Sequence, residues 1–136
     1  MTVKEFLAQG TTLNAAIDAK LEQLAELKAL ALTSKSFLSA AGGNERRSKV
    51  EATVEKIYQT EEEINGMIDR YVDTKKEISQ LLDKLEDNTV RSVMELHYLS
   101  GIKWEEVAER CYLSLRTVHN IHKKALALLE QERMIA

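Results

Sequence analysis

A basic stretch without carboxylates lies near the C-terminus of this chain. Between Arg110 and Leu129 the sequence has four cations and no acidic residue, although the whole chain carries 22 acidic and 19 basic residues and a net charge of -3. Because affinity for nucleic acid depends on where cations cluster, this stretch suits an anionic partner. Charge alone leaves one alternative open, which is chance clustering on a solvated helix face.

The side chains of this stretch have the chemistry needed to read DNA. Arg forms bidentate hydrogen bonds with guanine and Asn with adenine, and we assign these roles to Arg116 and Asn120. Lys123, Lys124 and Thr117 are assigned to phosphates, which position a protein on the duplex. The full predicted DNA-binding set is Leu115, Arg116, Thr117, His119, Asn120, Lys123 and Lys124.

Two helices joined by a tight turn are predicted to present these side chains. Apolar residues recur at helical spacing from Trp104 to Cys111, and Ser114 is a suitable N-cap for the next helix. Ala108 is small where the two helices approach each other most closely. This pattern is typical of a helix-turn-helix, whose second helix enters the DNA major groove. Its predicted core consists of Trp104, Val107, Ala108, Cys111, Leu113, Val118 and Ile121.

A further helix is predicted directly before this pair. Asp87 is a suitable N-cap, the segment from Val90 to Tyr98 carries apolar residues at helical spacing, and Gly101 supplies a stop. The three helices would form a C-terminal helix-turn-helix domain over residues 87–136.

Residues 1–86 are predicted to form a long helical hairpin or coiled coil. A short first helix would end before Gly10, and a longer helix would then run to about Ser39. A loop near residues 40–46, which contains the only two adjacent glycines of the chain, would reverse its direction.

Apolar residues recur every seven positions in both long helices, which is the spacing of coiled coils. In the first helix these residues are Ile17, Leu24, Ala31 and Leu38, with Leu13 and Leu27 beside them. In the second helix they are Val50, Ile57, Ile64, Tyr71, Ile78 and Leu85. Such long helices are not stable alone, so each apolar row must be covered by the other helix or by a second chain.

A companion row, four residues further along the second helix, begins at Val54 and is charged at every second position. Glu61 and Lys75 occupy these charged positions, at equal distances from Ile68. If two copies paired antiparallel, each Glu61 would face the partner's Lys75, and polar pairs of this kind fix the register of a coiled coil. We expect a homodimer through the coiled coil. The alternative is that both side chains snorkel at the edge of an intramolecular hairpin.

The composition indicates an all-α protein without enzymatic activity. Proline is absent and aromatic residues make up 5% of the chain, which favours long helices over sheets. No apolar run approaches the roughly 20 residues of a membrane span, so we expect a cytoplasmic protein. His119 and His122 lack a third ligand at a suitable spacing, and Cys111 lies on an apolar stripe. We therefore predict no metal, no cofactor and no catalytic residue.

The C-terminal sequence resembles region four of sigma factors. The resemblance lies in Val93, Leu96 and Tyr98, in Trp104-Glu105-Glu106-Val107-Ala108, in Ser114-Leu115-Arg116-Thr117-Val118 and in Lys124-Ala125-Leu126. The whole chain is similar to small sigma-region-4-like proteins encoded by phages and prophages of Gram-positive bacteria. This resemblance implies binding to double-stranded DNA and contact with RNA polymerase in the cytoplasm of a bacterial or phage-infected cell.

The predicted turn departs from many helix-turn-helix proteins at one residue. Tyr112 stands where these proteins often have glycine. A left-handed backbone costs a residue with a Cβ roughly 1 kcal/mol or more. We therefore expect a turn of another type at this position.

These observations favour a DNA-binding transcriptional regulator, and two alternatives remain. One is a protein-interaction adaptor that uses the helix-turn-helix as a docking surface. The other is a DNA-packaging component of the small-terminase kind, which also joins a helix-turn-helix to a coiled coil, although there the DNA-binding domain commonly comes first.

Overall fold

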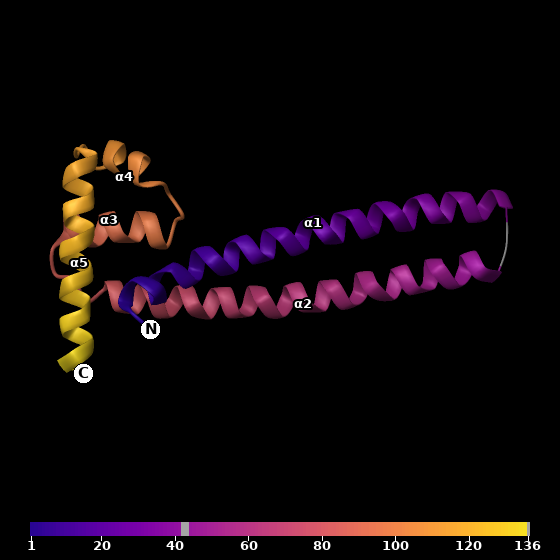
Figure 1. The fold of residues 1–136 in the computed structure, drawn as a ribbon, viewed down its shortest axis with the longest axis horizontal. Coiled ribbons are helices and arrows are strands. Elements are labelled where there is room, and N and C mark those ends of the chain that lie inside the picture. The colour runs from indigo at the N-terminus through magenta and orange to yellow at the C-terminus, as the bar shows by residue number, and fades with distance from the viewer. Residues whose placement is uncertain (42–43, 136) are drawn as a thin grey trace. The chain divides into compact units, whose positions relative to one another are not determined.

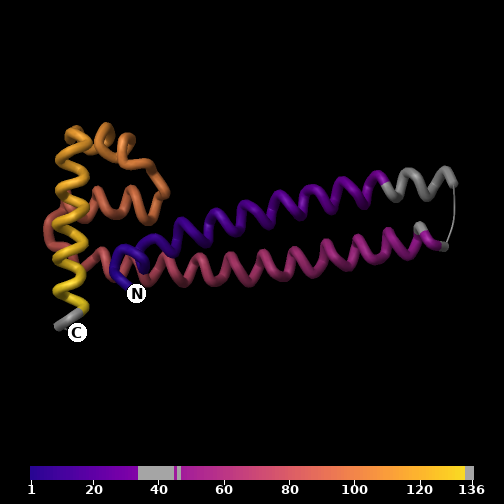
Figure 2. The backbone as a smooth tube through the Cα atoms, in the orientation of Figure 1, coloured from indigo at the N-terminus to yellow at the C-terminus, as the bar shows by residue number. Residues whose placement is uncertain are grey.

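The part of the chain that the structure describes consists of helices joined by short connections. The computed structural model describes the backbone of residues 1–41 and 44–135 and the side chains of residues 1–33, 45 and 47–133 (Figures 1 and 2). No strand occurs in these residues, and the predicted all-α class is confirmed. The helices are α1 (Val3–Ala41), α2 (Asn44–Leu82), α3 (Asn88–Tyr98), α4 (Trp104–Arg110) and α5 (Leu115–Ile135).

The chain divides into two compact units. The first unit comprises Met1–Leu13 and Tyr71–Ala136, and the second unit comprises Asn14–Arg70. The predicted boundary between residues 86 and 87 thus lies inside the first unit, which contains both ends of the chain. The glycine pair of the predicted loop and the side chain of Leu38 lie outside the described residues.

In the second unit, parts of α1 and α2 run antiparallel and cover each other (Figure 1). Ile17 and Ala31 of the predicted apolar row are buried on α1, and Ile64 is buried on α2. The Lys20 ammonium lies 3.0 Å from the Glu63 carboxylate and joins the two helices. This ion pair lowers the pKa of Glu63 through its hydrogen bond and its positive charge.

In the second unit the companion row of α2 lies three residues after the apolar positions, not four as expected, whereas Leu82 of the expected row is 0% exposed in the first unit. Thr60 is 3% exposed, whereas Val54 and Ile68 of the predicted row are 47% and 41% exposed. The Thr60 hydroxyl donates to the Lys56 carbonyl at 2.8 Å. Threonine can therefore be buried with its hydroxyl satisfied by its own helix, whereas an unpaired carboxylate such as Glu61 cannot. The helix consequently turns its threonine row inward and its charged row outward.

In the first unit, the start of α1 is part of the core. Val3 and Leu7 are 1% and 0% exposed and cluster with residues of α2, α3 and α5. The Val3 amide donates to Glu130 Oε1 at 2.7 Å, and the Arg133 guanidinium donates to the Met1 carbonyl. The whole buried cluster consists of Val3, Leu7, Ile78, Leu82, Leu85, Val90, Met94, Tyr98, Ala125 and Leu129.

Gly10 does not interrupt the chain as predicted, because α1 continues through it. It is buried, and a Cβ built on it would lie 3.5 Å from Ile78 Cδ1 and 3.7 Å from the Tyr98 carbonyl oxygen. Position 10 therefore lies inside a helix that faces Ile78 with room for a methyl group, and it is not a helix stop. Helix formation overrides the weak propensity of glycine because both flanking segments bury apolar residues.

This packing makes the response to substitution at Gly10 depend on size. A single methyl group meets only ordinary van der Waals contacts, so Gly10→Ala should raise the free energy of unfolding by about 0.5–1 kcal/mol through helix propensity. Gly10→Leu should lower it by about 1–3 kcal/mol through overpacking against Ile78. Urea denaturation measures both changes. Gly66 is a matched control because its Cβ would meet nothing within 4 Å; a Gly66→Leu variant as destabilised as Gly10→Leu would contradict this explanation.

Candidate nucleic-acid interface

Side-chain caps fix the starts of the two helices that frame the candidate interface. Asp87 is the N-cap of α3, and its carboxylate accepts from the amides of Thr89 and Val90 at 2.8 and 3.1 Å. At the start of α5 the Ser114 hydroxyl accepts from the Thr117 amide at 3.1 Å and donates to the Thr117 hydroxyl at 2.8 Å. These contacts satisfy amides that would otherwise lack partners in the first turns.

The turn between α4 and α5 is held by two backbone hydrogen bonds. The Leu113 amide donates to the Ala108 carbonyl at 2.9 Å, and the Tyr112 amide donates to the Glu109 carbonyl at 3.3 Å. This pair of bonds is the Schellman motif, which requires a left-handed residue directly after the helix. Tyr112 adopts that conformation with φ 57°, so the expectation of another turn type is wrong. Leu113 packs against the cluster that contains Val107 and Ala108 and fixes the turn.

An apolar cluster joins α3, α4 and α5. The three helices contact one another pairwise and lie beside each other in Figure 1. Val93, Val107 and Val118 are each 0% exposed at its centre. All seven residues of the predicted helix-turn-helix core lie in this cluster, namely Trp104, Val107, Ala108, Cys111, Leu113, Val118 and Ile121.

The exposed face of α5 carries four of the seven predicted DNA-binding residues. At ~100° per residue, Arg116, Asn120 and Lys123 lie within about 60° of one another around the helix axis, and His119 lies next to them. All four are exposed. Val118 lies buried on the opposite side of the helix, so this face of α5 points to the solvent.

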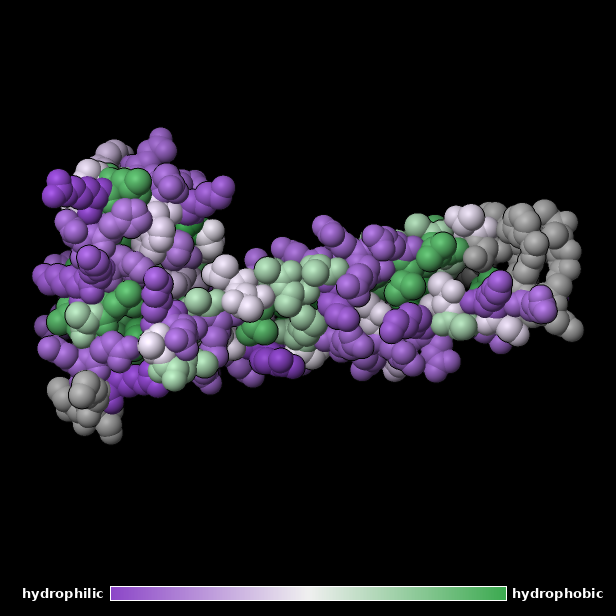
Figure 3. All heavy atoms as spheres, viewed as in Figure 1, coloured by the Kyte–Doolittle hydropathy of each residue, from purple (hydrophilic) through white to green (hydrophobic). Residues whose placement is uncertain are grey.

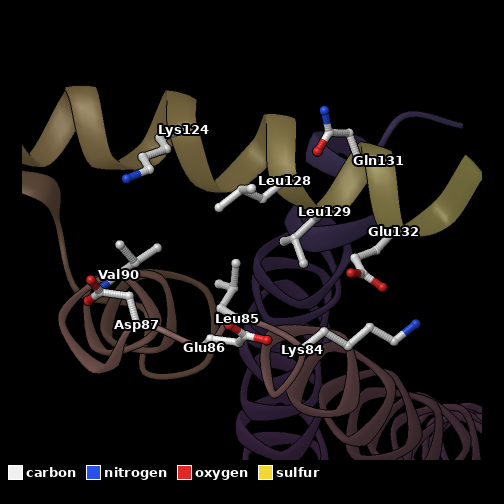
Figure 4. Close-up of a pocket in the computed structure, with 10 residues that line it drawn as sticks. All are labelled: Lys84, Leu85, Glu86, Asp87, Val90, Lys124, Leu128, Leu129, Gln131 and Glu132. Carbon is white, nitrogen blue, oxygen red and sulfur yellow. The ribbon is translucent and has the colours of Figure 1, made fainter. Parts of the chain in front are cut away.

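The other three predicted residues lie to the sides of this face. Leu115 is 38% exposed, and the Thr117 hydroxyl accepts the Ser114 hydrogen bond at the cap. Lys124 lines a groove of about 380 Å³ between α5 and the segment from Lys84 to Val90 (Figure 4). Three carboxyl-bearing residues line the same groove, namely Glu86, Asp87 and Glu132. The positive charge of Lys124 therefore lies in a mixed electrostatic environment.

The cations of the neighbouring helices are already paired. Arg110 lies 3.0 Å from Glu106 in an exposed ion pair within α4. Arg91 of α3 donates to the Leu85 carbonyl at 3.0 Å and lies 3.5 Å from Glu95. By contrast, Arg116 and Lys123 make no ion pair within the described part of the chain.

A cluster of aromatic and histidine rings supports α5 from the buried side. The Tyr98 hydroxyl lies 2.6 Å from His122 Nε2, and the His97 ring stacks on Trp104 with centroids 3.7 Å apart. His97 Nδ1 lies 2.8 Å from the Ile102 carbonyl and donates to it, because a carbonyl only accepts. Sequence reasoning did not bring these rings together, since their spacing along the chain carries no common signal.

Burial controls the protonation of this ring cluster. It raises the pKa of Tyr98 to about 12, so the hydroxyl keeps its proton and shares a hydrogen bond with His122. Burial, followed by the charges of His97, Lys4 and His119, lowers the pKa of His122 to about 4. Burial also lowers the pKa of His97, against the opposing effect of its hydrogen bond to Ile102. The cluster is therefore neutral near pH 7.

The described residues contain neither a membrane-spanning helix nor a cluster of metal-ligating side chains. No helix among them is long and apolar enough to cross a membrane. No group of three or more His, Cys, Asp or Glu side chains is arranged there to hold a metal ion.

The sequence of residues 31–130 matches the sequence model of a family described as "Protein of unknown function (DUF1492)". The chain belongs to this family. The DUF1492 match includes the whole segment from α3 to Lys124, and thus every residue of the predicted helix-turn-helix core and DNA-binding set. No curated protein and no solved structure matches the chain. The resemblance to sigma region four stays a prediction.

The depressed histidine pKa predicts a loss of stability in mild acid. Unfolded His122 takes up a proton as pH falls below about 6.5, whereas the folded protein resists this down to a pKa of about 4. The contribution of His122 to the free energy of unfolding should therefore be complete above pH ~6.5 and should decrease as the pH falls toward 4. Thermal unfolding at about pH 7 and 5 measures this, before most carboxylates titrate.

The His122→Gln variant tests the assignment because glutamine can still share a hydrogen bond with Tyr98 but does not titrate. It should lose part of the difference in Tm between the two pH values. Asn120→Gln changes an exposed, non-titrating residue of the same helix and should keep the full difference. An equal decrease in Tm between the two pH values in wild type and His122→Gln would contradict the role of His122.

Proposed function

We propose that this protein is a sequence-specific binder of double-stranded DNA that regulates transcription. In this proposal α4, the turn and α5 form a helix-turn-helix, and α5 enters the major groove. The observation that carries the proposal is the outward face of α5, where Arg116, Asn120 and Lys123 gather without a carboxylate among them. Arg and Asn supply the two side chains best suited to bidentate base contacts, and Lys supplies a phosphate contact.

The contacts that hold α5 in place favour the same function. The N-cap at Ser114 and the buried side of α5 hold the helix in one position, and base recognition needs such preorganised side chains. α5 is 21 residues long, and its second half packs against α1 through Glu130 and Arg133. Only the first half is therefore offered to DNA, which agrees with the way recognition helices use their N-terminal turns.

Two substitutions separate base reading from phosphate binding. Arg116→Ala should weaken binding to the preferred duplex by about 1–3 kcal/mol and relax sequence preference. Lys123→Ala should weaken binding to all duplexes alike and reduce the slope of log K against log salt by about 1. Fluorescence anisotropy, with duplexes selected from a random pool and titrated between about 50 and 200 mM salt, measures both.

Lys28→Ala is the matched control, because Lys28 is exposed on α1 in the second unit, outside the proposed interface. It should leave the affinity and the salt slope unchanged. Absence of any binding by the wild-type chain near 50 mM salt would contradict the proposal. RNA polymerase would then be the next partner to test, as the adaptor function requires a protein surface.

We propose that the second unit mediates a homodimer. Val54, Tyr58 and Ile68 are 47%, 65% and 41% exposed. They lie within about 80° of one another on α2 at ~100° per residue, with Glu61 between them. Figure 3 shows apolar residues among polar ones on one face of this unit. An exposed apolar row of this length favours association with another helix.

A charge introduced into the apolar row should separate the dimer without unfolding the protomers. Ile68→Lys should shift the species seen in sedimentation velocity from dimer to monomer at micromolar concentration, with unchanged helical circular dichroism, because a charge opposes burial. Gln59→Lys, on another exposed side of α2, should remain dimeric. A monomeric wild type would contradict the dimer, and a ring-sized oligomer would favour the small-terminase function.

A further inference from the structure

Tyr112 combines two features that do not help the protein to fold. Its backbone has φ 57°, a left-handed conformation that is unfavourable for a residue with a Cβ. Its side chain is 96% exposed, so the aromatic ring has almost no contact within the chain. Glycine would form the same Schellman turn without the strain.

The position of this side chain is fixed although the ring is solvated. The two hydrogen bonds of the turn hold the backbone on both sides of Tyr112. Leu113 is anchored in the apolar cluster, and Ser114 caps α5 directly afterwards. The phenol is therefore attached to a rigid backbone, two residues before the helix cap and four before Arg116.

From this geometry we infer that the Tyr112 hydroxyl donates a hydrogen bond to a phosphate oxygen of the DNA backbone. The inference rests on the proposed function. A turn that precedes the N-terminus of a recognition helix lies at the edge of the major groove, where the phosphates run. Tyrosine is one of the neutral side chains that bind phosphates in this way, and such contacts fix register without reading sequence.

A neutral donor has a signature that distinguishes it from a cation. Removing a lysine changes the number of counterions released and so changes the salt slope, whereas removing a hydroxyl does not. Tyr112→Phe should therefore weaken binding about tenfold at every salt concentration, on preferred and other duplexes alike, with an unchanged slope. Lys123→Ala, measured beside it, should change the slope.

Tyr112→Gly adds a readout in the opposite direction. It relieves the left-handed strain, so its Tm should rise while its DNA affinity falls about as much as in Tyr112→Phe. Gly101, which also has a positive φ of 70°, provides the matched control. Gly101→Ala should lower Tm and leave DNA affinity unchanged, showing that a change in stability does not by itself alter binding.

Anisotropy and thermal unfolding of the full chain decide between the outcomes. Parallel weakening in Tyr112→Phe and Tyr112→Gly, with a raised Tm in the latter, supports the phosphate contact. Wild-type affinity in both variants overturns it and leaves the proposed function standing. Weakening in Tyr112→Gly alone also overturns it, since the ring and not the hydroxyl would then make the contact. A wild-type chain that binds no DNA overturns both the proposed function and this inference.

Discussion

The structure of the first unit depends on the burial of one side of α5. Val118, Ala125 and Leu129 are each 0% exposed, and they divide between the two apolar clusters of this unit. Val118 belongs to the cluster with α4, whereas Ala125 and Leu129 belong to the cluster with α1 and α2. Because one helix contributes to both cores, α5 cannot rotate without exposing apolar residues in each. Its outward face is therefore fixed by packing that lies entirely behind it.

The ring cluster adds a polar constraint to this apolar one. The Tyr98 hydroxyl and His122 Nε2 would each be costly to bury alone, and their hydrogen bond at 2.6 Å satisfies both. The bond joins α3 to α5 at one register, since a shift of α5 by a single residue would break it. Apolar burial thus supplies most of the stabilisation, and the hydrogen bond supplies the alignment.

Signals within a few residues of each other predicted the local structure well. The caps at Asp87 and Ser114, the stop at Gly101 and the heptad row of Ile17 and Ile64 all depend on neighbours in the chain, and the structure contains each of them. The failures have a different origin. The poor helix propensity of glycine predicts a break at Gly10, but α1 continues through it because the segments on both sides bury apolar residues.

The choice between two possible seams on α2 shows why hydropathy counting was insufficient. By apolar content, a row with Val54 and Ile68 ranks above a row with Thr53 and Thr60. Each of these threonines donates its hydroxyl to a carbonyl four residues earlier, at 2.8 Å, so its burial leaves no unsatisfied group. Glu61 has no such internal partner, and it is exposed together with Val54 and Ile68 of its row. A polar side chain that can hydrogen-bond to a carbonyl of its own helix should therefore be counted among the residues that can be buried.

Only part of the candidate interface could be predicted from the sequence, because only part of it depends on residues that are close together in the chain. The exposed face with Arg116 and Asn120 follows from helical periodicity, which is a local property. The lateral position of Lys124 does not, because it depends on the groove formed with Glu86 and Asp87, about forty residues earlier in the chain. The left-handed conformation of Tyr112 could not be predicted either. The cost of this conformation for a residue with a Cβ argues against it, and the two hydrogen bonds of the turn that offset this cost are visible only in the structure. A strained residue persists when its neighbours are held independently, and here Ala108 and Leu113 are both held by the apolar cluster.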